Sequence, residues 1–227
     1  MLTKPQAEAF EVVKQVLASG RALFFDTYDA GIPAASSVLV RNDHLVPQFG
    51  FVGRHYNHGG LLILGINPGN GHRSRGVRSK SDETMMPALY ALKNTPSEEN
   101  YQNAMDAQLE GSSDWEATSE INQKLTEAGV DITEIAYTNA LPYRAENPLS
   151  NSAAIQRAVK FWVSPLVAAL KPSVFVAFGK GRPTAVLKCA RILAHPVVFD
   201  RELVQSHRAA KNVDFVARLI AALKIAR

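Results

Sequence analysis

Three short segments of this chain carry polar side chains that suit the recognition of a planar heterocycle. Residues 65–69 read Gly-Ile-Asn-Pro-Gly, residues 137–142 read Tyr-Thr-Asn-Ala-Leu-Pro, and residues 206–208 read Ser-His-Arg. The amides of Asn67 and Asn139 each accept from a ring N–H and donate to a ring carbonyl, and a neutral imidazole donates one hydrogen bond. Uracil presents the matching pattern at its N3 and O4 atoms. The sequence therefore indicates a site for a base or a similar heterocycle.

Several other kinds of chemistry lack the residues that they need. The candidate segments contain no pair of acids for the usual glycoside hydrolysis and no nucleophile elbow. The six histidines are scattered without the spacing of a metal site, and no Gly-Lys-Ser/Thr follows the first segment. Cys189 is the single cysteine, so a disulfide framework, a thiolate zinc site and a cysteine-ligated iron–sulfur cluster are excluded. We therefore expect no metal and no cofactor.

These segments must be positioned by strands, and the first of them follows an apolar run at 61–65 that predicts a buried strand. Similar runs predict three more strands, at 134–139, 173–178 and 197–199. Helical spacing predicts helices at 6–18, 85–93, 97–109, 119–128, 152–170, 183–191 and 213–225, with a long polar loop at 70–84. Pro165 predicts a kink or a break in the helix that contains it. Alternating strands and helices predict an α/β fold with a mostly parallel four-stranded sheet and helices on both faces.

In such a sheet the three polar segments leave the same end, where open α/β sheets bind ligands. Gly65 and Gly69 permit backbone angles or close approaches that side chains forbid, and Pro68 stiffens the turn. Asn67 is then held rigidly. Asn139 ends a buried strand, so we expect its amide to point into a cleft.

Two basic runs lie beside these segments. Residues 72–80 contain four cations in nine residues, and the second run is 207–211. Each is also compatible with an ordinary solvated face, but their placement beside two candidate loops favours contact with phosphates. The net charge of +4 is compatible with this. The candidate DNA-binding residues are Arg73, Arg75, Arg78, Lys80, Arg208 and Lys211.

The length of 227 residues and an apolar content of 46% suit one domain, with 1–60 as a lead-in and 61–227 as the core. No apolar run approaches the ~20 residues that span a bilayer. The first residues lack the apolar centre of a secretory signal. We expect a cytoplasmic protein that does not contact membranes.

On the motifs above, the chain resembles the uracil-DNA glycosylase superfamily. Residues 65–69 look like its first motif, in the Asn-containing form of the mismatch-specific and single-strand-selective branches. Residues 137–142 resemble the strand with the uracil-reading Asn, and 178–181 the glycine turn before a helix. Residues 206–212 resemble the second catalytic motif, which is usually His-Pro-Ser. The resemblance covers about residues 60–225 and implies a monomeric, monofunctional glycosylase with a three-layer α/β sandwich.

The resemblance also implies roles for individual residues in the release of uracil, or of a related deaminated base, from DNA during base excision repair. Asn67 and His207 would be catalytic: Asn67 positions the attacking water, and His207 hydrogen-bonds uracil O2 and stabilises the departing base by ~3–4 kcal/mol. Asn139 would read the uracil edge. Arg208 would fill the gap in the base stack or grip flanking phosphates. The substrate-binding set is Gly65, Ile66, Pro68, Gly69, Asn139 and Ser206.

Two departures from the family pattern stand out. Arg208-Ala209 replaces the Pro-Ser that usually follows the second-motif histidine, and His195-Pro196 is a competing candidate for that motif. The region after the first motif also lacks the stacking aromatic of the family. The replacement candidates for that platform are Met85, Met86, Phe51, Tyr56 and Tyr143.

Each candidate residue also has a purely structural interpretation. Asn67 caps turns readily, Asn139 is compatible with a buried amide that ties two loops together, and His207 with a residue at a helix start. Trp115 and Trp162 are expected to be packing residues. Asp82 and Glu83 are expected to be solvated or to cap a helix, with a catalytic carboxylate as the remaining alternative. Residues 143–144 are expected in a cleft or in a surface turn. Two alternative functions follow, a non-catalytic binder of altered bases with the same fold and a small-nucleotide-binding α/β protein.

Overall fold

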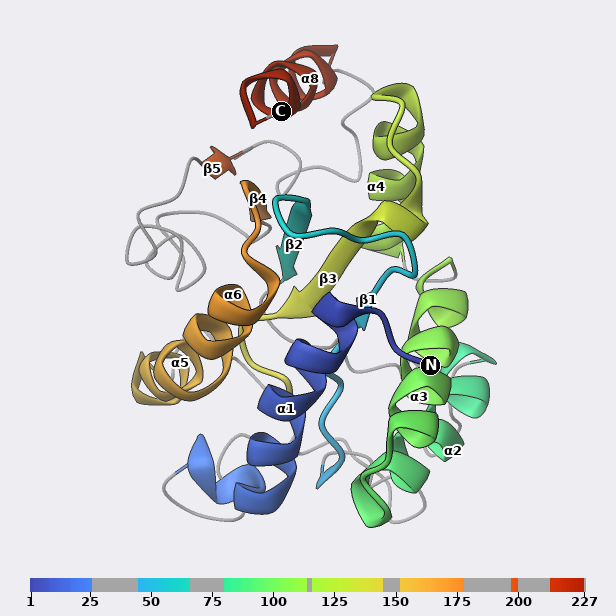
Figure 1. Cartoon of the computed structure of the whole chain (residues 1–227), viewed down its shortest axis with the longest axis vertical. Coiled ribbons are helices and arrows are strands. Elements are labelled where there is room, and N and C mark those ends of the chain that lie inside the picture. Colours follow the sequence, from blue (N-terminus) through green and yellow to red (C-terminus); the bar gives the residue numbers. More distant parts are fainter. Residues whose placement is uncertain are drawn as a thin grey trace.

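The computed structural model describes residues 1–25, 45–65, 80–113, 116–144, 152–177, 197–199 and 213–226. These residues form an α/β fold around one sheet, in the order β1-β3-β2-β4-β5 (Figure 1). The strands are β1 (Phe51–Val52), β2 (Leu61–Gly65), β3 (Ile135–Asn139), β4 (Val174–Ala177) and β5 (Val197–Phe199). The α-helices are α1 (Lys4–Ser19), α2 (Lys80–Asn94), α3 (Glu98–Ser112), α4 (Glu116–Glu127), α5 (Ser152–Ala158), α6 (Ser164–Leu170) and α8 (Val213–Ala226).

The four strands that the sequence predicts are present, and they pair in parallel as β3-β2-β4-β5. β2 lies in the middle and all five of its residues are buried. A strand that is covered on both faces has a continuous apolar sequence, which explains why the run at 61–65 predicted β2. β1 adds a fifth strand, antiparallel to β3. Sequence analysis missed β1 because two residues are too short for any periodicity.

The helices pack around the sheet in groups that are far apart in sequence. α1 packs against α6, α2 packs against α3, and α8 contacts β4 and β5. In Figure 1, α1 lies in front of the sheet, between the α5–α6 pair on the left and the α2–α3 pair on the right. The ring of Phe10 on α1 stacks on Tyr101 of α3 at 4.8 Å between centroids. The described parts of the expected lead-in therefore belong to the same core as the strands.

The start of α2 corrects the sequence analysis. The helix begins at Lys80, inside the stretch 70–84 that was expected to be a polar loop. Its first turn carries Asp82 and Glu83, and acidic side chains there are favoured by the helix dipole. Glu83 is exposed as expected, but Ser81 and Asp82 are buried. The polar residues at the start of α2 are therefore not all in contact with solvent.

The break expected in 152–170 takes the form of a π-helical turn, η4 (Val159–Val163), between α5 and α6. Pro165 then lies in the first turn of α6, where its missing N–H costs no helical hydrogen bond. The proline thus directly follows the π turn, and the backbone keeps right-handed helical angles at Ala158, Val163 and Ser164.

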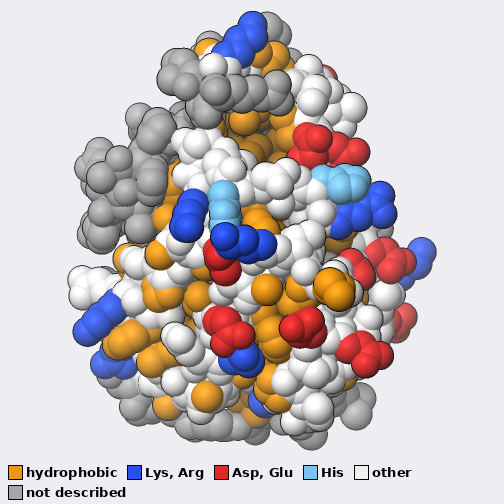
Figure 2. Space-filling view, viewed as in Figure 1, with side chains coloured by type: hydrophobic (Ala, Val, Ile, Leu, Met, Phe, Trp, Pro, Cys, Tyr) orange, Lys and Arg blue, Asp and Glu red, His pale blue; other side chains and the backbone are white. Residues whose placement is uncertain are grey.

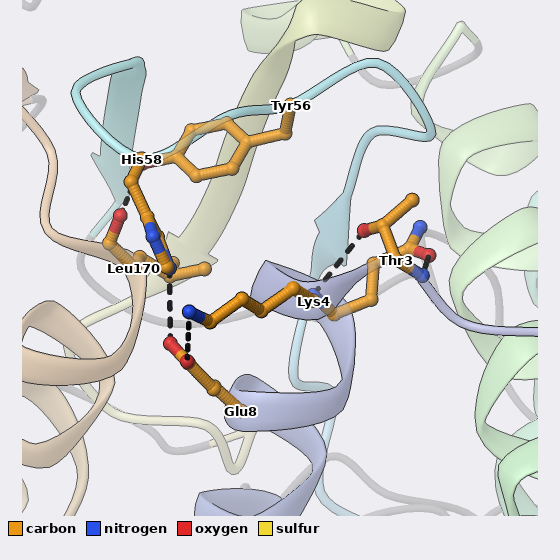
Figure 3. Close-up of polar contacts among 7 residues, drawn as sticks. Thr3, Lys4, Glu8, Tyr56, His58 and Leu170 are labelled. Atoms are coloured by element: carbon orange, nitrogen blue, oxygen red, sulfur yellow. Dashed lines mark hydrogen bonds and ion pairs between the residues drawn. The ribbon is translucent and has the colours of Figure 1, made fainter.

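The amino end of the sheet, where β2 to β5 begin, is tied to α1 and α6 by the loop before β2 (Figure 3). His58 Nε2 lies 2.9 Å from Glu8 Oε2 on α1, and Tyr56 Oη donates to the Leu170 carbonyl at 3.1 Å. Thr3 and Gln6 form a capping box at the start of α1, and this explains why the helix begins before the predicted position. The first strand of the parallel set therefore enters the sheet from a fixed loop.

Candidate functional site at the carboxyl end of the sheet

Gly65 and Asn139 lie side by side at the carboxyl end of the sheet, where β2 and β3 finish. They are register partners in the parallel pair, and Ala140 N donates to Gly65 O at 2.8 Å. Two of the three polar segments therefore lie at the same end of the sheet, as the sequence predicts, and the structure shows that their strands are neighbours. The third segment, around His207, lies outside the described residues.

Gly65 is required for the close approach of the Asn139 side chain. A Cβ placed on Gly65 lies 2.4 Å from Asn139 Oδ1 and 3.2 Å from Tyr137 Oη. A methyl group at this position would displace the amide. The absence of a side chain at Gly65 therefore leaves the space that the Asn139 amide occupies.

Asn139 is buried and held at both its side chain and its backbone. Tyr137 Oη donates to Oδ1 at 3.5 Å, and the Trp162 indole N–H donates to the Asn139 carbonyl at 3.0 Å. Each contact comes from a residue with its own packing, because Tyr137 stacks on Phe51 and Trp162 packs against Phe49. The Asn139 amide is therefore a preorganised polar group.

Trp162 has a role that the sequence did not reveal. It was expected to be a packing residue, and it is fully buried, but its N–H also bonds the end of β3. It lies in the π turn η4, a feature that often occurs beside functional sites. The sequence gives only a weak indication of this role. A buried Trp needs a hydrogen-bond partner for its N–H, but the sequence does not identify that partner.

A buried polar network holds the segment that follows Asn139. Arg144 forms an ion pair with Asp82 of α2 through Nη2 and Oδ1. With its amide oxygen turned toward Arg144, Gln48 accepts from Nε at 2.8 Å and from Nη2 at 3.2 Å. Arg21, in the 3-10 turn η1 (Arg21–Leu23), donates to the Arg144 carbonyl at 3.3 Å. Residues 140–144 are thus attached to α2, to η1 and to the segment before β1.

This network corrects two expectations. Asp82 is buried rather than solvated, although it does lie in the first turn of a helix, and of the two alternatives for 143–144 the surface turn is wrong because both residues are buried. Burial of both charges is tolerated because each finds the other, although the partners are 62 residues apart in sequence. Such a distant pairing leaves no local signal.

The segment before β1 completes this end of the sheet. Gln108 of α3 accepts from Gly50 N at 2.9 Å and donates to Gly50 O at 2.6 Å. Thr138 Oγ1 donates to Phe49 O at 2.9 Å, and Gln48 N donates to Pro142 O at 2.7 Å. This segment fixes the backbone on both sides of Asn139, although its sequence predicts no helix or strand.

The replacement platform for base stacking is not formed by the residues that the sequence suggested. The five side chains are all buried in the core, namely Met85, Met86, Phe51, Tyr56 and Tyr143. Burial also raises the pKa of the Tyr56 and Tyr143 hydroxyls above their ordinary range. These residues support the fold and offer no open surface to a base.

Of the predicted site residues, the structure describes Gly65, Asn139 and Lys80. Lys80 is exposed at the start of α2. The others lie outside the described residues: Ile66, Asn67, Pro68, Gly69, Arg73, Arg75, Arg78, Ser206, His207, Arg208 and Lys211, as does the competing His195. Figure 2 shows basic and acidic side chains intermixed over the coloured part of one face, without a continuous basic surface there.

Within the described ranges, no three His, Cys, Asp or Glu side chains come together as metal ligands. In the same ranges, every helix is too short or too polar to cross a bilayer. No protein-family model matches the chain, and no curated protein matches it. The interpretation of the site therefore depends on its residues and geometry.

Proposed function

We propose that the protein is a monofunctional DNA glycosylase with a three-layer α/β domain, which hydrolyses the bond between deoxyribose and uracil or a related deaminated base. The observation that carries the proposal is the buried Asn139 amide, held over Gly65 where two parallel strands end. A rigid carboxamide suits the N3–H and O4 edge of uracil, because it accepts from one and donates to the other. This end of a parallel sheet is also where ligands bind in open α/β folds.

The remaining roles belong to residues on either side of this pair in the chain. Asn67 follows Gly65 by two positions and orients the water whose oxygen forms the new bond to C1′. The C1′–N1 bond breaks, and its electron pair leaves with the base. His207 donates to uracil O2 and stabilises this charge, and the water proton passes to solvent. Because an amide takes up no proton, turnover is slower than with a carboxylate at position 67.

The base reaches the site only after leaving the stack, at a cost of a few kcal/mol. The cations at 72–80 and 208–211 grip the DNA backbone, and Lys80, the exposed first residue of α2, is one of them. Neutralised phosphates release counterions, so binding weakens steeply as salt rises.

The direct test is release of uracil from single-stranded and duplex oligonucleotides, read as strand cleavage at the abasic site after alkali. We expect product with the wild type and a loss of about 100-fold or more for Asn67→Ala, in the range of a missing transition-state contact. Glu83→Gln is the matched control, because Glu83 is exposed on α2. Folded wild-type protein that gives no product on either substrate would refute the proposal.

One observation favours a second candidate function. Arg208-Ala209 replaces the Pro-Ser of the second motif, and this change suits a protein that binds an altered base without releasing it. Salt-dependent binding of uracil-containing DNA with no abasic product would select this function instead.

A further inference from the structure

Tyr137 lies two residues before Asn139 on β3, so both side chains project from the same face of the strand. Its hydroxyl donates to Asn139 Oδ1 at 3.5 Å and lies 3.2 Å from the Cβ position of Gly65. Its ring is half-buried and stacks on Phe51 at 5.8 Å, with the planes 21° apart. The hydroxyl is therefore held beside the amide by the packing of the ring.

The two ends of a carboxamide differ chemically but have nearly the same shape. A half-turn about the last torsion exchanges the acceptor Oδ1 for the donor Nδ2. Uracil and cytosine differ in the same sense, because uracil presents N3–H with a carbonyl and cytosine presents a bare N3 with an amino group. The orientation of the Asn139 amide therefore decides which base it matches.

We propose that Tyr137 is the specificity-determining positioning residue of the site, and that its hydroxyl selects uracil-type over cytosine-type bases by fixing the orientation of the Asn139 amide. The inference rests on the proposed function. A phenol is a better donor than acceptor, because its oxygen lone pair is delocalised into the ring, so it favours Oδ1 as its neighbour over Nδ2. The second lone pair of Oδ1 still accepts from N3–H, and Nδ2 donates to the base carbonyl.

The test compares Tyr137→Phe with wild type, using free uracil and free cytosine as competitive inhibitors of uracil release. At 3.5 Å this hydrogen bond lies at the weak end of the usual range, so we expect its loss to lower the preference for uracil over cytosine, given by the ratio of the two inhibition constants, by about twofold. Cytosine inhibition becomes stronger or stays constant while uracil inhibition weakens. An unchanged ratio would overturn the inference.

Tyr56→Phe is the matched control. Tyr56 is buried, and its hydroxyl donates to the Leu170 carbonyl at the other end of the sheet. Both variants lose one tyrosyl hydrogen bond, but only Tyr137→Phe changes the ratio. Equal changes in both variants would assign the effect to general loss of stability and would refute a specific role for Tyr137.

A second measurement does not depend on activity. In wild type, Oδ1 faces Gly65, so the Asn139 amide protons give no strong nuclear Overhauser effect to the Gly65 α-protons. In Tyr137→Phe we expect this signal to appear as the amide turns over. If wild type released no uracil, the proposed function would fail, and this experiment would still decide whether Tyr137 fixes the amide. A strong signal in wild type, or none in either protein, would overturn the inference.

Discussion

The two ends of the parallel sheet are both rich in polar contacts, but they differ in burial. At the carboxyl end, Asp82, Arg144 and Asn139 are 1%, 2% and 4% exposed. At the amino end, the side chains of His58 and Glu8 are 27% and 34% exposed, and Asp131 is exposed. The charged side chains are therefore shielded from water at one end and open to it at the other, whereas the uncharged Tyr56–Leu170 hydrogen bond at the amino end is buried.

This difference in burial indicates at which end of the sheet the side-chain positions are fixed more strictly. Burial of an ion pair costs several kcal/mol of desolvation per charge, and an apolar replacement of similar volume is often as stable. An exposed pair costs little and contributes little. We infer that the buried network at the carboxyl end serves to fix the segments around Asn139, whereas the amino end only closes the fold.

The largest predicted effect is the loss of one partner from the buried ion pair. Asp82→Ala leaves the Arg144 guanidinium buried without its carboxylate, and we expect unfolding to become easier by about 3–5 kcal/mol in urea titrations. The double variant Asp82→Leu with Arg144→Met should regain most of this stability. A single variant within 1 kcal/mol of wild type would contradict the burial contrast.

The second prediction concerns Gly65→Ala, which pushes a methyl group against the Asn139 amide. We expect a stability loss of about 1–3 kcal/mol from overpacking. Uracil release should fall more than stability accounts for, because the amide moves.

Gly111→Ala is its control, since a Cβ on this α3 residue finds Ser81 at an ordinary 3.5 Å. That variant should keep both stability and activity. Equal behaviour of the two alanine variants would show that Gly65 is not special.

The third prediction removes the indole N–H with Trp162→Phe. The Asn139 carbonyl then loses a buried donor, so we expect a stability loss of about 1–3 kcal/mol. Hydrogen exchange should accelerate at Ala140 N, whose bond to Gly65 O closes the end of the two strands. An unchanged exchange rate at Ala140 N would show that the Trp162 N–H does not stabilise the ends of β2 and β3.

Local features explain what the sequence could predict of the fold. The apolar run at 61–65 predicts β2, and the alternation of strands and helices predicts the parallel arrangement. That arrangement places Gly65 and Asn139 at the same end of the sheet, whereas their pairing in register is shown only by the structure. β1 and the start of α2 were missed, because a two-residue strand and a buried polar turn carry no periodic signal.

Long-range contacts explain what the sequence missed at the site. The Asp82–Arg144 pair and the Trp162–Asn139 hydrogen bond join residues 62 and 23 positions apart. Residue type alone suggested solvent or a helix cap for Asp82, a cleft or a surface turn for Arg144, and simple packing for Trp162. Only the folded chain shows that each of these side chains has a specific partner.

The fourth prediction tests the amino end with Glu8→Gln. The contact with His58 and the 4.0 Å contact with Lys4 are both partly exposed. We expect a stability change within about 1 kcal/mol, smaller in high salt. A loss as large as that of Asp82→Ala would erase the difference between the two ends.

The smallest effect is predicted for Asp131. Hydrogen bonds from the Thr133 backbone N–H and then from its hydroxyl lower the pKa of the exposed Asp131 carboxyl. A lowered pKa in the folded state stabilises the protein above the unfolded pKa, near pH 4, and this stabilisation is lost as pH falls through the folded value. Asp131→Asn should therefore differ from wild type near neutral pH and converge with it in acid, in urea titrations over pH 2–7. Water competes for this exposed carboxylate, so the stability difference between Asp131→Asn and wild type near neutral pH should be smaller than the stability loss in Glu8→Gln. A larger difference would mean that exposure does not determine how much these contacts contribute to stability.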